Sequence, residues 1–82
     1  MTFATNDTVC IVGRSGTSYI GNIANKSSAD SLSTFPAVPA EQAISIVDAQ
    51  IFTLSPSYGC ALATAKRELH IRVADIESIS RA

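Results

Sequence analysis

The sequence predicts a mainly β protein, built as one small, strongly bent barrel of five antiparallel strands. Three observations favour this fold class. The β-prone stretches are short and separated by turn residues, a glycine interrupts one of them, and no segment has a convincing helical period. The 82 residues make a single domain, 1–82, near the lower end of what folds unaided. Oligomerisation is therefore a natural supplement to its core.

The first two expected strands form a hairpin. Residues 9–12, Val-Cys-Ile-Val, are all apolar, which is typical of a strand buried on both faces. Residues 13–16 are turn residues that tolerate positive φ, and residues 17–23 are again β-prone. Gly21 interrupts this second strand, and a glycine in that place commonly marks the sharp bend of a small barrel.

The same stretch does not fit a phosphate-binding loop. That motif requires a lysine and a hydroxyl residue directly after its second glycine. Counted from Gly13, the position of the second glycine holds Ser18, and counted from Gly16, the second glycine is followed by Asn22. We therefore prefer a plain hairpin to a nucleotide-binding loop.

Residues 25–42 are expected to form a long insertion loop. They are rich in Ser, Ala, Pro and Asp, and their only sizeable apolar residues are Leu32, Phe35 and Val38. Residues 39–42 are compatible with one helical turn, since proline suits a first helical position and an acidic residue suits the N-terminal end of a helix. A loop of this length in so small a domain is often functional.

Residues 44–54 are predicted to form a long strand. Its apolar phase shifts near Ile46 and Val47, which indicates a bulge or a bend. Residues 55–59, Ser-Pro-Ser-Tyr-Gly, are then expected to form a turn.

Residues 60–69 leave two alternatives open. Their Ala, Leu, Lys, Arg and Glu favour a helix, whereas the clean apolar alternation that follows over 69–73 favours a strand, which we prefer. Residues 74–79 end the sheet as a short strand with Ile76 and Ile79 facing inward.

Charge and cysteine content limit the functional classes. The net charge of −1 and the pI of about 5.6 exclude binding of nucleic acid by bulk attraction, so any such site must be local. Cys10 and Cys60 lack the paired spacing of zinc or redox motifs, and we expect both to be reduced core residues. With no long apolar run and no leader-like start, we expect a cytoplasmic protein with no membrane partner.

Hydroxyl residues beside the first glycines raise the question of a catalytic serine. Acyl transfer needs a base within reach and a third group that orients it. His70 is the one histidine, and nothing in the sequence places it near Ser15 or Ser18. We therefore expect no enzymatic activity, no catalytic residue, no cofactor and no metal.

Two segments together resemble the Sm-like family. The first is similar to the family's Gly-x-x-apolar-x-Gly-x-apolar signature, and the second to its apolar-x-Ile-Arg-Gly-x-x-Ile pattern. Val73 stands where the second pattern has glycine, and the family's Asp and Asn between the second and third strands have no clear counterpart here. The matching positions are Gly16, Tyr19, Gly21 and Ile23 in the first segment, and Leu69, Ile71, Arg72 and Ile76 in the second.

The resemblance implies an Sm-like (SH3-like) barrel that assembles into a cyclic homo-oligomer of about five to seven subunits. The fourth strand of one copy would pair with the fifth strand of the next. Such a ring would bind single-stranded RNA or DNA near its central hole, with a role in nucleic-acid processing or chaperoning. One arginine per subunit would then become a circle of guanidinium groups, which reconciles nucleic-acid binding with an acidic pI.

The candidate nucleic-acid-binding residues lie in the second motif and in the long loop. Arg72 alternates away from the apolar face and could bind phosphate or stack on a base; the alternative is a surface arginine paired with Asp75. His70 could contact a base or be an ordinary strand histidine, and Phe35 could be a stacking platform. The basic pair at 66–67 fits either a backbone contact or a solvated turn. The candidate set is Arg72, His70, Asp75, Phe35, Lys26 and Asn25.

A second functional class stays open. The chain could be a structural or assembly subunit, a homo-oligomeric β-barrel with no nucleic-acid ligand. The acidic pI and the missing pocket residues favour this alternative, whereas the paired motifs favour nucleic-acid binding.

Overall fold

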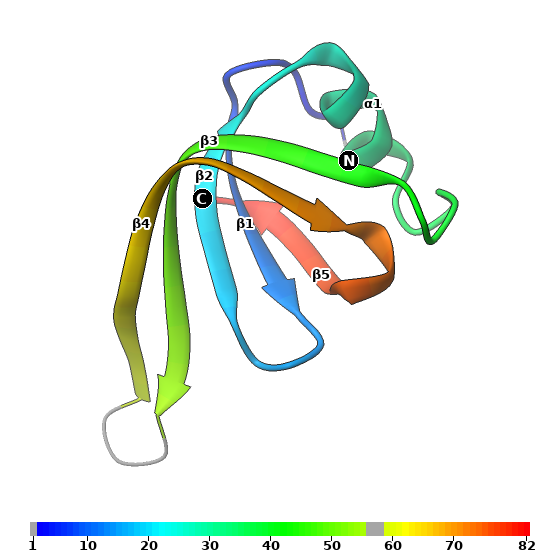
Figure 1. The fold of residues 1–82 in the computed structure, drawn as a ribbon. Coiled ribbons are helices and arrows are strands. Elements are labelled where there is room, and N and C mark those ends of the chain that lie inside the picture. The colour runs from blue at the N-terminus through cyan, green and yellow to red at the C-terminus, as the bar shows by residue number, and fades with distance from the viewer. Residues whose placement is uncertain (1, 56–58) are drawn as a thin grey trace.

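Five antiparallel strands in one bent sheet make up most of the protein (Figure 1). The computed structural model describes residues 2–55 and 59–82, so most of the predicted turn at 55–59 lies outside the described residues. Within these residues no helix has the length and apolar character to cross a membrane. In chain order the elements are β1 (Thr8–Gly13), β2 (Ser18–Ile23), α1 (Lys26–Thr34), β3 (Ala43–Ser55), β4 (Gly59–Arg72), the 3₁₀ turn η1 (Val73–Asp75) and β5 (Ile76–Arg81).

The strand order is β4-β3-β2-β1-β5, and every neighbouring pair is antiparallel, as predicted. Residues 59–72 form one continuous strand, which decides the helix-or-strand question for 60–69 in favour of the strand. Figure 1 shows β3 and β4 as a long hairpin that folds over, so that one half extends beside β2 and the other half crosses toward η1. The molecule is therefore elongated, 36 Å long and 20 to 22 Å in its other dimensions.

The bend lies where β3 passes Gly21. Ile20 pairs with Gln50 and Asn22 with Val47, so β3 holds one more residue than β2 at this place. The extra residue forms a bulge in which Asp48 has a φ of 52°. A Cβ on Gly21 would lie 3.0 Å from the Val47 carbonyl oxygen. The glycine therefore makes room for the bulge that the apolar phase shift near residues 46–47 predicted.

The core lies inside the curved sheet and under α1. In β1, Val9 and Ile11 are fully buried, whereas Cys10 and Val12 are only half-buried. The prediction of a strand buried on both faces was therefore wrong, as was that of a core position for Cys10, because only one face of this antiparallel sheet meets the core. The side chain of Cys60 lies outside the described residues. The buried apolar residues are Phe3, Val9, Ile11, Ile23, Ala29, Leu32, Ile44, Ile46, Ala49, Ile71, Val73 and Ile76.

The segment predicted as a loop over 25–42 contains a helix, which corrects the prediction. Asn25 caps α1, since its Oδ1 accepts the Ser28 N–H at 2.8 Å. Ala29 and Leu32, three positions apart, are buried against the core. Only these two of the nine helical residues are apolar, so the sequence shows no clear helical period here. Residues 39–42 form a single turn closed by a 3.0 Å bond from the Gln42 N–H to the Pro39 carbonyl.

Helix α1 takes over from β2 as the neighbour of β3. The last bond on this side joins the Ala24 N–H to the Ser45 carbonyl at 3.1 Å, just after β2 ends. The Ser45 N–H instead donates to the Ser28 Oγ at 2.8 Å, and Ser28 is 2% exposed. The N–H of half-buried Ser45 therefore finds its acceptor on the helix.

The two ends of the chain meet at Arg81. Its Nη1 lies 3.1 Å from the Asp7 Oδ2, its Nη2 donates to the Thr2 carbonyl, and its guanidinium stands 5.1 Å from the centre of the Phe3 ring. The Phe3 N–H in turn donates to the Ser33 Oγ at 2.8 Å. These contacts connect β5, the N-terminal segment and α1.

Candidate nucleic-acid interface

The end of β4 presents its polar side chains on one face. Ile71 and Val73 are buried and Leu69 is half-buried, whereas His70 and Arg72 are exposed. This is the alternation expected of a strand with one face on the core. Arg72 is the last residue of β4 and pairs with Ala43 at the start of β3.

His70 is held by a neighbour on each side. Its Nδ1 lies 2.8 Å from the Ser45 Oγ, and its Nε2 lies 3.2 Å from Glu68 Oε1. The His70 and Glu68 side chains are 62% and 61% exposed, so both ring contacts are open to water. The Glu68 contact could have been inferred from the two-residue spacing within a strand, but the Ser45 contact depends on the β3–β4 register.

Turn η1 is held firmly by backbone bonds. The Val73 N–H donates to the Gln42 carbonyl at 2.8 Å, and the Ala74 N–H donates to the Ala40 carbonyl at 3.0 Å. From the other side, the Arg14 Nε donates to the Ala74 carbonyl at 3.0 Å. The segment that follows Arg72 is therefore fixed between the β1–β2 hairpin and the turn before β3.

Arg72 has no carboxylate partner among the described residues, where the ion pairs are His70–Glu68 and Arg81–Asp7. Arg72 and Asp75, both among the described residues, therefore do not form the ion pair that was the alternative. The Asp75 residue is exposed, and its backbone carbonyl accepts the Arg14 N–H at 2.8 Å. The Arg72 guanidinium thus keeps its donors available at the surface.

The candidates of the 25–42 segment lie at opposite ends of α1. Asn25 caps the helix, and Lys26 is its exposed first residue. Ala24 is bonded to Ser45, so this end lies across β3 from His70. Phe35 follows the other end, half-buried and packed against the core. Nine helical residues span about 14 Å, so Phe35 is well separated from Lys26.

The comparison with solved structures shows the fold. An Sm protein from Pyrococcus abyssii, solved in complex with a uridine heptamer, superposes with a TM-score of 0.64 at 13% identity, over 95% of this chain and 86% of that one. The chain has an Sm-like fold. Neither a protein-family model nor a curated protein sequence matches it. The likeness is therefore one of structure, at a level of identity that carries the architecture alone.

Proposed function

We propose that copies of this chain form a homo-oligomeric ring that binds single-stranded RNA, with Arg72 of each copy as the principal contact. The observation that carries the proposal is the exposed Arg72 at the end of β4 in an Sm-like fold, with no carboxylate partner in the described part of the chain. The solved Sm protein with the same fold was bound to a uridine heptamer. A role in RNA processing or chaperoning would follow from such binding.

The side chains at the end of β4 have the chemistry to bind single-stranded RNA. A guanidinium can bind a phosphate through two parallel N–H bonds or stack on a base. His70 and its cross-strand neighbour Ser45 add a ring and a hydroxyl on the same face, two residues from Arg72 along β4. Unpaired bases are recognised by such stacking and edge contacts, whereas a duplex would hide them.

The sheet edges support assembly. β4 and β5 are the outer strands of the sheet, and in the described residues each has a neighbour on one side only. An unpaired edge presents a row of free N–H and carbonyl groups, which another copy can satisfy. Pairing of β4 with β5 of the next copy would repeat around a ring of about five to seven subunits and leave no free edge.

A second candidate function is that of a structural subunit whose ring carries no nucleic acid. Two observations favour it. Helix α1 occupies the segment between β2 and β3, where the Asp and Asn of the Sm-like family have no clear counterpart. The net charge of −1 gives no bulk attraction for nucleic acid. A ligand titration separates the two candidates.

Anisotropy titration of labelled oligo-U at several salt concentrations tests the RNA proposal. We expect Arg72→Ala to weaken binding roughly tenfold or more, since one stacking contact contributes about 1–3 kcal/mol per base. The slope of log K against log salt should become shallower, by about 0.7 for each phosphate contact removed. Thr5→Glu, at an exposed position outside β4 and β5, changes the net charge equally and is the matched control. Without saturable wild-type binding at low salt, the structural-subunit function replaces the RNA proposal.

A further inference from the structure

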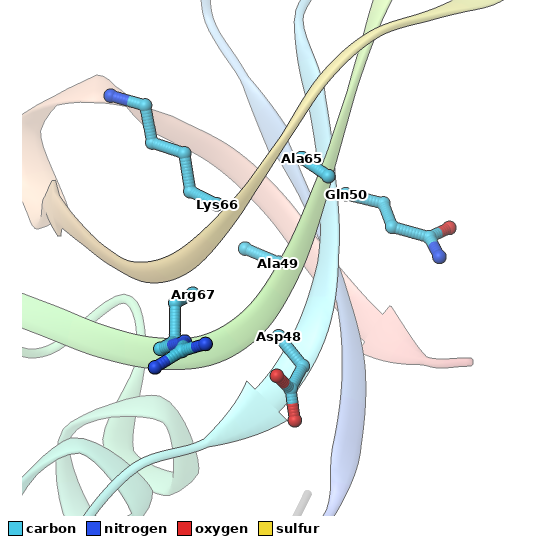
Figure 2. A pocket seen from close by; sticks show the side chains of 6 residues that line it. All are labelled: Asp48, Ala49, Gln50, Ala65, Lys66 and Arg67. Carbon is cyan, nitrogen blue, oxygen red and sulfur yellow. The ribbon is translucent and has the colours of Figure 1, made fainter.

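A hollow of about 330 Å³ lies at the bend of the β3–β4 hairpin, away from the end of β4. Figure 2 shows the six side chains that line it. Ala49 and Ala65 are small and leave the space open, whereas the other four residues are polar or charged. The lining residues are Asp48, Ala49 and Gln50 from β3 and Ala65, Lys66 and Arg67 from β4. The volume is at the lower end of small-ligand sites, which hold roughly 300–1,000 Å³.

Two of the lining side chains are cations without a partner. Lys66 and Arg67 are exposed, and neither forms an ion pair within the described part of the chain. Asp48 is the one carboxylate of the lining, so the hollow keeps a net positive charge in a chain whose overall charge is −1. Figure 2 shows Arg67 and Asp48 on the same side of the hairpin, with Lys66 extending away from them. An anion fits this charge distribution better than a cation does.

The backbone of the hollow is formed before any ligand arrives. Asp48 has a φ of 52°, in the left-handed region that non-glycine residues rarely adopt. Its neighbour Ala49 is 1% exposed and packs where a Cβ on Gly21 would come within 3.2 Å of its Cα. The bulge is thus held by the core beneath it, and it bends β3 at the hollow.

The hollow and the end of β4 lie on the same strand. Arg67 precedes Arg72 by five residues, which is a span of at most about 17 Å along β4. Barrels of another fold, the OB-fold, bind about 4–16 nucleotides of a single-stranded nucleic acid. A single-stranded RNA of such a length, bound at Arg72, is therefore long enough to reach Arg67.

We propose that this hollow is a second contact for the same RNA strand and takes one nucleotide of it. Arg67 would bind the phosphate, and Lys66 would add positive charge on the other side of the hairpin. The Asp48 carboxylate would accept hydrogen bonds from the sugar hydroxyls or the base edge, and the Gln50 amide would accept or donate them there. The inference rests on the proposed function, because it assumes the strand that Arg72 binds.

The test compares a short oligo-U of about four nucleotides with a long one of about twelve, using the intact wild-type assembly. Arg72→Ala should weaken binding of both. The double variant Lys66→Gln/Arg67→Gln should bind the short oligonucleotide as the wild type does, which also shows that it folds. Its affinity for the long one should fall roughly tenfold, with a salt slope shallower by up to about 1.4. Thr5→Glu/Ser15→Glu makes the same change in net charge at exposed positions outside β4 and β5 and should leave the difference between the two lengths unchanged.

Two outcomes overturn the inference while leaving the proposed function in place. In the first, the double variant binds the long oligonucleotide as tightly as the wild type does. In the second, the Thr5→Glu/Ser15→Glu control lowers the affinity for the long oligonucleotide equally, which would make the effect one of bulk charge. If wild type binds neither oligonucleotide, the proposed function itself fails.

Discussion

At the scale of single residues, Asp7 shows how one side chain connects distant parts of the chain. Its Oδ2 accepts the Ala4 N–H at 2.9 Å and lies 3.1 Å from the Arg81 Nη1. The Ala4 N–H, followed by the hydrogen bond and charge of Arg81, holds the pKa of Asp7 below its ordinary value of 3.8. The carboxylate form is therefore favoured by the folded chain.

A lowered carboxylate pKa predicts the pH range in which Asp7 stabilises the fold. Its contribution is present above pH 3.8 and is lost as the pH falls through the lower pKa of the folded state. Asp7→Asn should therefore lower the urea midpoint at pH 7. The gap between variant and wild type should close as the pH falls through that lowered pKa and Asp7 becomes protonated. A gap of constant size across this range would show that Asp7 acts through shape and not through charge.

At the scale of elements, α1 replaces a strand neighbour for β3. The buried Ser28 Oγ accepts the Ser45 N–H, and Asn25 caps the helix that carries it. On the opposite side of β3, Ser45 meets His70, so α1 also supports the strand beneath the candidate interface. A helix of low apolar content thus has a defined structural role.

Removal of the Ser28 hydroxyl should reveal that role. Ser28→Ala leaves the Ser45 N–H without its acceptor, which costs about 1–3 kcal/mol in the free energy of unfolding. Ser27→Ala, at the exposed neighbouring position of the same helix, makes the same change in helix propensity and should stay within about 0.5 kcal/mol of wild type. If denaturant titrations gave equal losses in the free energy of unfolding for the two variants, the Ser28 hydroxyl would not be the group through which α1 stabilises β3.

At the scale of the whole molecule, the free outer edges of β4 and β5 and the small core predict an oligomer. Light scattering should give a mass several times that of the 8.6 kDa chain. The unfolding temperature should rise with protein concentration, since association stabilises the folded state by mass action. High salt should leave the mass unchanged, because strand pairing uses backbone bonds. A mass of one chain would contradict both proposed functions.

Much of the sheet and part of the candidate site could be predicted from local pattern. The glycine-containing turn at 13–16, the alternation over 69–73 and the phase shift near 46–47 each depend on residues close together in the chain, and the structure has all three. The exposure of Arg72 follows from the same alternation. These features could be predicted because the side chains of a strand alternate between its two faces, so burial of one face gives a period of two residues.

The remaining features were decided only by tertiary structure. Helix α1 has too few apolar residues to be recognised before its contact with β3 is known, and only the buried side of the sheet shows that Cys10 faces away from the core. The contact of His70 with Ser45 and the hollow beside Lys66 both depend on the register of β3 against β4. The sequence by itself determined where the chain turns and alternates. Which side chains meet was decided by the β3–β4 register and the packing of α1 on β3, because these bring together residues that no local period relates.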